Sequence, residues 1–191
     1  MDDYKKYKPK LREEFSYACA YCETRETELG GSQSFHIDHY RPKKIFPELT
    51  YSYNNLIYAC RNCNQYKSDF WPKFRQLILG NIIFNPRPIG NIKKHIDTSS
   101  NKWTGKTNSG LWSIKRLRLD SNILIKRRER RATFEKAIKR LKSIYEENEK
   151  NLSKAIDEEL EEDIIKKIKS DMYELEKEIS AIESQIYGAM D

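Results

Sequence analysis

The sequence predicts an α+β protein in which a small core stapled by zinc precedes a long helical region, either a helical hairpin or a coiled coil. Three observations support this prediction. All four cysteines occur in two Cys-x-x-Cys pairs with 37 residues between them, Cys19/Cys22 and Cys60/Cys63. A segment that alternates like a strand lies between the pairs. After residue 120, apolar residues recur at steps of three and four, as they do along helices that pair.

The composition is that of a basic chain with a large exposed surface. Hydrophobic residues make up 38% and charged residues 34% of the 191 residues, which is lean for a single packed core. The net charge of +7 is uneven, because residues 1–120 carry +9, residues 121–142 carry +7 and residues 143–191 carry −9. We therefore expect the front of the chain to bind a polyanion and the acidic end to form a separate module.

The first 70 residues contain short elements around the cysteines. In order, these are a helix at 10–18, a strand at 35–40, a loop, an apolar stretch at 54–59 and a helix at 64–68. Strand alternation places His36 and Asp38 on one face and Ile37 and His39 on the other. Residues 71–120 are interrupted by Gly and Pro, and the pattern predicts short strand-like or irregular pieces there. His95 and Trp103 fall in this part without a spacing that assigns them a role.

The region from 121 onward is expected to be helical and to serve assembly, whereas residues 1–120 form the core domain. Its apolar stripe runs through positions 134, 138, 141, 145, 152 and 155, and resumes after a slip near 156–164 at 168, 172, 175, 179, 182 and 186. The slip fits a stutter in one long helix or a hairpin that turns near Asn148–Ser153, and the hairpin is slightly favoured. If the two helices of the hairpin differ in length, Ile179, Ile182 and Ile186 find no partner within it and are expected to pack against another surface.

The spacing of the cysteines indicates a structural zinc site. A gap of two residues lets a tight turn aim both thiolates at one ion, and two such turns complete tetrahedral coordination by Cys19, Cys22, Cys60 and Cys63. Iron in a rubredoxin-like site and a redox dithiol use similar pairs. The second pair adjoins a cluster of polar residues, which favours zinc.

That polar cluster has the groups that phosphodiester hydrolysis requires. The Asp38 carboxylate and the Asn64 amide oxygen are hard ligands suited to Mg²⁺ or Mn²⁺, and His39 can take a proton from water as general base. His36 is either a further metal ligand, a phosphate contact or a structural residue. Four basic residues beside the cluster are expected to contact substrate phosphates: Arg41, Lys43, Lys44 and Lys67.

This constellation resembles the HNH, or His-Me finger, endonucleases. The family pattern is a zinc knuckle, Asp-His with a nearby proline, Asn-Leu, a second knuckle followed by Asn, and a Lys. Here its parts are Cys19-Ala-Tyr-Cys22, Asp38-His39 with Pro42, Asn55-Leu56, Cys60-Arg-Asn-Cys63-Asn64 and Lys67. The resemblance implies a ββα-metal unit in which His39 is the general base, Asp38 and Asn64 hold the catalytic metal, and Asn55 fixes the loop that orients the base.

Two longer segments, 36–43 and 53–68, resemble the PtuB-type nucleases of Septu and retron anti-phage systems. That likeness implies a role in antiviral defence beside an ATPase subunit of ABC or SMC type, called PtuA. DNA is the favoured substrate, and a homodimer is a further expected assembly. A catalytically inactive zinc-ribbon module that binds nucleic acid is the alternative. The polar N-terminus carries no export signal, and no apolar run approaches the roughly 20 residues of a membrane span, so the cytoplasm is the expected location.

Overall fold

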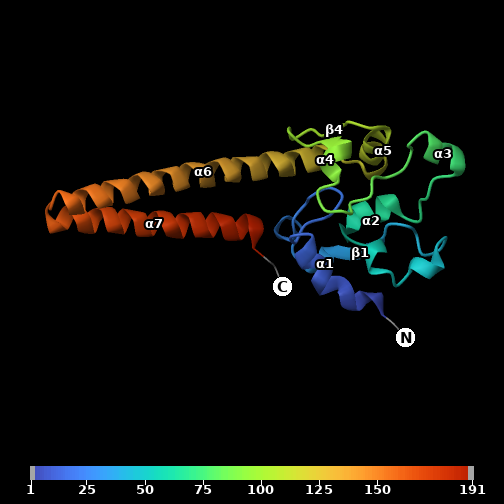
Figure 1. Cartoon of the computed structure of the whole chain (residues 1–191), viewed down its shortest axis with the longest axis horizontal. Helices are drawn as coiled ribbons and strands as arrows, with labels where there is room; N and C mark the ends of the chain where they lie inside the picture. The colour runs from blue at the N-terminus through green and yellow to red at the C-terminus, as the bar shows by residue number, and fades with distance from the viewer. Residues whose placement is uncertain (1–2, 189–191) are drawn as a thin grey trace. The chain divides into compact units, whose positions relative to one another are not determined.

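The computed structural model describes residues 3–188, which form two compact units, 3–128 and 129–188 (Figure 1). The first unit is built from short helices and two small antiparallel sheets. Its elements are η1 (Tyr4–Tyr7), α1 (Lys8–Glu14), η2 (Glu26–Glu28), η3 (Ser32–Ser34), β1 (Phe35–His39), η4 (Pro47–Leu49), η5 (Tyr53–Asn55), β2 (Leu56–Cys60), α2 (Arg61–Lys67), α3 (Phe74–Ile78), α4 (Ile92–His95), β3 (Ile96–Asp97), β4 (Thr104–Gly105), α5 (Asn108–Leu117) and the start of α6 (Asn122–Asp157).

The centre of the first unit is the β1–β2 pair with the helix that follows it. The two strands are antiparallel, with Phe35 opposite Cys60 and His39 opposite Leu56. All five residues of β2 are buried, and the Phe35 ring stacks on Tyr58 at 4.9 Å between centroids. Since β2 runs directly into α2, the strand pair and the helix form a continuous ββα arrangement.

The burial of β1 departs from simple strand alternation. Phe35, Asp38 and His39 are buried, whereas His36 is exposed. Strand alternation predicts that Asp38 and His39 lie on opposite faces, but both side chains are buried. Asp38 is covered because it bonds to side chains from two other segments, and His39 because the N-terminal segment packs on it.

The first helix is shorter than the sequence suggests. It spans Lys8–Glu14 instead of 10–18, with a proline in its first turn. It stops there because Ser16 and Tyr17 adopt left-handed conformations, with φ of 51° and 57°. The chain then turns toward the first cysteine pair.

The expectation of irregular structure over 71–120 was wrong in one important respect. Residues 108–117 form the regular helix α5, although Gly110 lies inside it. The Thr107 side chain caps its start by accepting a hydrogen bond from the Gly110 N–H. Gly110 is a packing residue, because a Cβ there would overlap the carbonyl oxygen of His95. His95 itself stacks on Phe84 and bonds to Thr107 through Nδ1.

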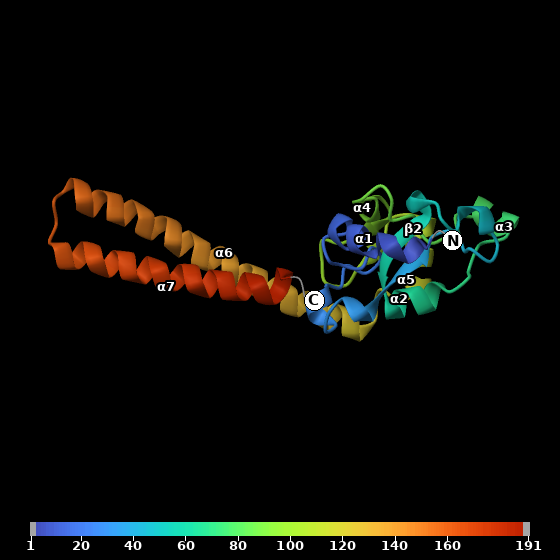
Figure 2. The ribbon, with the colours of Figure 1, turned by 90° about the horizontal axis from the view of Figure 1, so that it is seen from below.

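The second unit contains the rest of α6 and α7 (Glu162–Tyr187), which run side by side (Figures 1 and 2). The chain reverses between Asp157 and Glu162, inside the slip at 156–164. The turn does not lie near Asn148–Ser153, which is helical throughout. Lys142 pairs with Glu183 at 2.7 Å, and the Tyr187 hydroxyl bonds to Glu135. No helix among residues 3–188 has the length and apolarity to cross a membrane.

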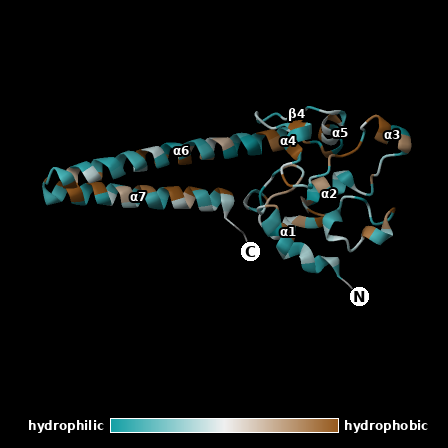
Figure 3. Cartoon of the chain, viewed as in Figure 1, coloured by the Kyte–Doolittle hydropathy of each residue, from teal (hydrophilic) through white to brown (hydrophobic). Residues whose placement is uncertain are grey.

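The apolar stripe of the tail is largely used within this pair of helices. Ile138, Ala155 and Ile186 are buried, and Ile179 and Ile182 are half-buried. Hydrophobic bands accordingly recur along α7 (Figure 3). Ile186 is therefore not left for another surface as predicted, while Ile179 and Ile182 are partly covered within the pair. Because the turn lies later in the chain than predicted, the two helices are more nearly equal in length and pair over more of that length.

The Gly110→Ala substitution tests the packing of α5. Helix propensity alone would favour alanine by about 1 kcal/mol, but the new methyl group meets the His95 carbonyl, which also accepts from the Lys106 N–H. We expect a net loss of about 1–3 kcal/mol in the free energy of unfolding, measured by urea denaturation. Lys115→Ala, at an exposed position of the same helix, is the control and should be near neutral. A stabilised Gly110→Ala variant would contradict this packing.

Candidate functional site

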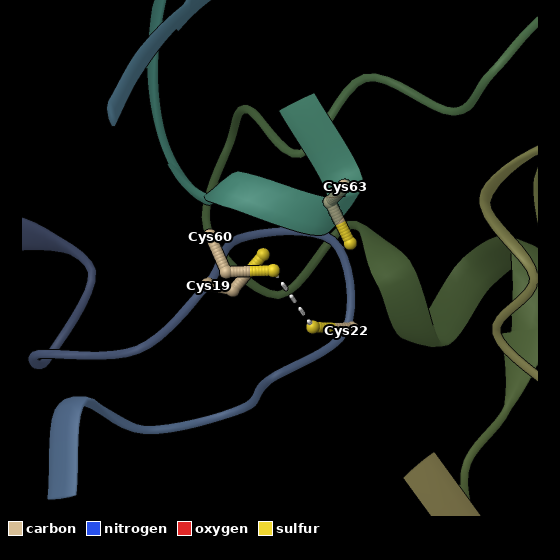
Figure 4. Close-up of side chains that lie close together, drawn as sticks. All are labelled: Cys19, Cys22, Cys60 and Cys63. Carbon is tan, nitrogen blue, oxygen red and sulfur yellow. Dashed lines mark hydrogen bonds between the residues drawn. The ribbon is translucent and has the colours of Figure 1, made fainter. Parts of the chain in front are cut away.

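The four cysteines meet at one buried point (Figure 4). Their sulfur atoms all lie within 4.8 Å of one another, none forms a disulfide, and Cys22 Sγ is 3.8 Å from Cys60 Sγ. A tetrahedral zinc site with Zn–S bonds of about 2.3 Å has S–S edges of about 3.8 Å. The donor set and its spacing therefore fit a tetrahedral metal ion, and the expectation that both pairs share one site is confirmed.

Backbone hydrogen bonds shape the first cysteine turn and join it to β2. The Cys19 N–H donates to the Thr24 carbonyl at 2.9 Å, and the Glu23 N–H donates to the Cys19 carbonyl at 2.8 Å. Within the turn, the Ala20 N–H donates to the Tyr58 carbonyl of β2 at 2.9 Å. The second pair needs no separate turn, because Cys60 ends β2 and Cys63 lies in the first turn of α2.

Burial and mutual hydrogen bonds shift the pKa values of three of the four thiols. Burial raises the pKa of Cys19 well above its ordinary value. Hydrogen bonds, first of all from Cys19, lower the pKa of Cys22, and the bond with Cys19 raises that of Cys63. A divalent cation binds thiolates, so its binding would displace the protons from these sulfurs.

A cleft of about 690 Å³ opens beside this site. The N-terminal segment, β1, the loop after it and α2 form its walls. Its lining residues are Tyr4, Lys5, Lys8, Phe35, His36, Ile37, Asp38, His39, Pro42, Lys43, Asn64, Gln65, Ser68 and Asp69. It therefore brings together Asp38, His39 and Asn64, the three residues for which the sequence predicts chemistry.

Asp38 is held by two buried partners. The Tyr21 hydroxyl donates to Oδ2 at 2.6 Å, and the Lys67 ammonium donates to Oδ1 at 2.9 Å. Burial raises the pKa of Tyr21 well above its ordinary value, and the Asp38 charge adds to this, so Tyr21 stays a donor. Because a carboxylate offers about four acceptor positions, these two bonds fix its orientation and leave capacity toward the cleft.

Lys67 is too deeply buried to contact a substrate phosphate. Its side chain is 1% exposed, and its ammonium donates to Asp38 and to the His39 carbonyl at 2.6 Å. A lysine this buried needs a paired carboxylate. Lys67 therefore sits inside the core of the site as a positioning and charge-balancing group.

His39 has one ring nitrogen engaged and one available. Its Nε2 is 3.0 Å from the Thr50 carbonyl oxygen, and since a carbonyl only accepts, Nε2 carries the proton. That leaves Nδ1 unprotonated in the neutral ring. Burial, the largest effect, lowers the pKa of His39 below its ordinary value, despite the bond to Thr50. The ring is also fixed edge-on by Tyr4, with centroids 4.7 Å apart. The site thus holds a neutral imidazole with one free lone pair.

Asn55 ties down the loop between the strands. Its Oδ1 accepts from the Arg41 N–H at 2.8 Å, and its Nδ2 donates to the carbonyls of Arg41 and Leu49 at 3.0 and 3.2 Å. The loop between these contacts and β2 contains Thr50, the partner of His39. Asn55 therefore acts on the imidazole through the backbone.

The remaining predicted residues lie around the cleft. His36 is exposed on its wall, with a pKa lowered by burial and then by Lys8. The basic residues after β1, Arg41, Lys43 and Lys44, are exposed. Arg41 stacks over Phe46 and Trp71. Among the described residues, the cysteines form the one group of three or more His, Cys, Asp or Glu side chains placed to hold an ion, so no such carboxylate–histidine cage surrounds His36.

Sequence reasoning missed four residues of the site. Tyr21, Tyr4 and Thr50 act through contacts with distant segments, which no local pattern announces. Ser68 lines the cleft with φ 50° and ψ −148°, a region that glycine normally occupies. Of the four, only Tyr21 had a visible signal, since it lies between the two cysteines of the first knuckle.

Comparison with known families gives one match. Residues 18–70 match the family HNH endonuclease, a stretch that contains both cysteine pairs, β1, β2 and α2. No curated protein and no solved structure matches the chain. Over this stretch the chain is therefore similar to the HNH endonuclease family.

The cysteine site generates a test of metal content. We expect the purified chain to retain one zinc ion after dialysis, by elemental analysis, because four buried thiolates bind zinc with roughly 10–16 kcal/mol in small peptides. Cys63→Ser should lose the metal and the cooperative unfolding transition, since this energy exceeds the stability of many domains. Tyr58→Phe, a buried neighbour that is not a ligand, should keep the zinc. Iron in the site, or no retained metal, would refute the assignment.

Proposed function

We propose that this chain is a metal-dependent endonuclease that hydrolyses phosphodiester bonds, with DNA as the favoured substrate and residues 1–120 as its nuclease domain. The observation that carries the proposal is the cleft, in which a carboxylate, an amide oxygen and a neutral imidazole face one space. The matching family supports the same reaction class.

His39 is the general base in this proposal. Its Nδ1 accepts a proton from water as the water oxygen bonds to phosphorus and the P–O bond to the leaving oxygen breaks. Thr50 fixes the protonated Nε2 and so the direction of Nδ1. The contacts of Asn55 hold the loop that presents Thr50. A positioned base of this kind contributes roughly 10²–10⁴-fold to the rate.

Asp38 and Asn64 would hold the catalytic cation, Mg²⁺ or Mn²⁺. Both are hard oxygen donors, and the ion supplies charge stabilisation to the phosphate when it is bound. One carboxylate with one amide is a weak site, and the Lys67 ammonium on Asp38 further opposes a second positive charge nearby. We therefore expect the cation to be held firmly only together with substrate phosphate. His36 remains a candidate contact to the cation or to the substrate phosphate.

The structural ion is proposed to be zinc. Four thiolates with tetrahedral spacing favour zinc among the common cellular ions. Tyr21 lies in the first cysteine turn and donates a hydrogen bond to Asp38, so it links the ion site to the cleft. The exposed side chains of Arg41, Lys43 and Lys44 next to the cleft are proposed phosphate contacts. The buried Lys67 is assigned instead to orienting Asp38.

The biological setting is proposed from sequence resemblance. The likeness of segments 36–43 and 53–68 to PtuB-type nucleases supports an anti-phage effector that works with an ATPase subunit. Because the tail pairs most of its own apolar stripe, an assembly partner or a second copy would use other residues. Exposed apolar side chains on the tail and in α3 are the candidates: Phe74, Leu77, Ile78, Ile156 and Tyr173.

The His39→Ala substitution tests the proposed base. We expect cleavage of plasmid DNA in Mg²⁺ or Mn²⁺ to fall by roughly 10²–10⁴-fold, while zinc content and DNA affinity stay near those of the unaltered chain. His95→Ala is the matched control, since His95 lies outside the cleft, and it should cleave normally. Full activity of His39→Ala would rule out the mechanism.

The Tyr21→Phe substitution tests the link between the cysteine turn and Asp38. Partners of metal ligands typically contribute 10- to 100-fold to affinity or activity, so we expect a loss of that order with zinc content unchanged. Tyr58→Phe is the control, because its hydroxyl bonds to another buried carboxylate, Glu26, away from the cleft. Equal losses of activity per folded molecule in both variants would mean that Tyr21 has no specific role.

A further inference from the structure

A second concave site lies between α2 and α5, and the proposed chemistry does not use it. Its volume is about 320 Å³. One aromatic residue of α2 and four residues in and just after α5 line it: Tyr66, Trp112, Lys115, Arg116 and Arg118. The lining carries three cations and no carboxylate, so the site suits an anionic ligand.

The cations of this site lie on aromatic faces. The Arg116 guanidinium lies 5.1 Å from the centroid of Phe70, and that of Arg118 lies 4.9 Å from the centroid of Tyr66. Phe70 in turn packs against Trp112, with centroids 5.8 Å apart. Flat aromatic surfaces interleaved with arginines are the composition by which proteins bind nucleic-acid strands, with stacked bases and paired phosphates.

Two features of this site raise the free energy of the folded chain when no ligand is bound. The indole N–H of Trp112 is buried without a hydrogen-bond partner, a state that an acceptor atom would relieve. Arg118 ends α5 in the left-handed conformation, with φ 53° and ψ 42°, where glycine is the favoured residue.

We propose that this basic-aromatic site binds the nucleic-acid strand at a point away from the cut. Arg116 and Arg118 pair with phosphates, and a base packs against the aromatic wall formed by Tyr66 and Trp112. The inference rests on the proposed function, since it concerns the same substrate, and it adds a binding site on other residues.

The location of the site fits this role. Asn64 lines the catalytic cleft and Tyr66 lines the basic-aromatic site. Two residues along a helix are about 200° apart around its axis, and a helix with its side chains is about 10 Å wide. The strand would therefore reach the second site by passing α2, a few nucleotides from the cleft. Asp69 lines the catalytic cleft, and the next residue, Phe70, packs against Trp112 of the second site, so these two neighbours lie along the same path.

The test measures binding of a labelled 12-nucleotide single-stranded DNA to the full chain in buffer without Mg²⁺ or Mn²⁺. The double variant Arg116→Ala/Arg118→Gly removes both cations, and glycine suits the left-handed position, so folding should be kept. Two lost phosphate contacts should lower the slope of log affinity against log salt by about 1.4 for a single strand. Lys93→Ala/Lys94→Ala removes two exposed charges elsewhere and should leave the slope nearly unchanged.

A second measurement tests stacking. Binding of the same DNA should quench tryptophan fluorescence, and Trp112→Phe should abolish most of that quenching while Trp71 and Trp103 remain. A double variant with wild-type affinity and slope overturns the proposal. So does displacement of the DNA by polyglutamate of equal charge at equal concentration, which would indicate an acidic peptide ligand. A chain that binds DNA through this site but never cleaves it contradicts the proposed function alone.

Discussion

The convergence of four cysteines on one point is the constraint on which the geometry of the cleft depends. A pair of five-residue strands is too small to be stable by itself, and here one cysteine pair precedes the strands and the other follows them, so that their convergence holds the strand pair in place. Tyr21, between the first two cysteines, reaches Asp38. Cys60 and Cys63 begin the helix that carries Asn64 and Lys67. An ion that joins the cysteine pairs would therefore also fix the distance between β1 and α2.

The site is electrostatically balanced before any catalytic cation binds. The Asp38 carboxylate is buried, and the Lys67 ammonium compensates its charge at 2.9 Å. An unpaired buried carboxylate would cost several kcal/mol or take up a proton. Lys67 therefore orients the Asp38 carboxylate and balances its charge. In the proposed mechanism, substrate phosphates would add negative charge to the cleft and so favour binding of the catalytic cation.

The sequence predicted the features that depend on local spacing. The cysteine pairs, the first strand and the helical tail follow from residue types at fixed intervals, whereas the strand–strand–helix order was expected from the resemblance to HNH endonucleases. The helix α5 was missed because Gly110 indicates an interruption until its contact with the His95 carbonyl is known. The turn of the tail was placed too early, since residues 148–153 are helical and the chain reverses only at the slip after Asp157. The role of Lys67 was misjudged because burial of a lysine depends on a distant carboxylate. Tyr4 and Thr50 reach His39 from segments that only the tertiary fold brings together.

The most direct test of this account is a crystal structure of the full chain carrying His39→Ala, with an oligonucleotide and Mn²⁺. Anomalous scattering distinguishes zinc from manganese. The account predicts zinc among the four cysteine sulfurs and manganese on Asp38 and Asn64, bridged to a phosphate in the cleft and with Tyr21 still bonded to Asp38. Manganese bound elsewhere, with the phosphate outside the cleft, would contradict it.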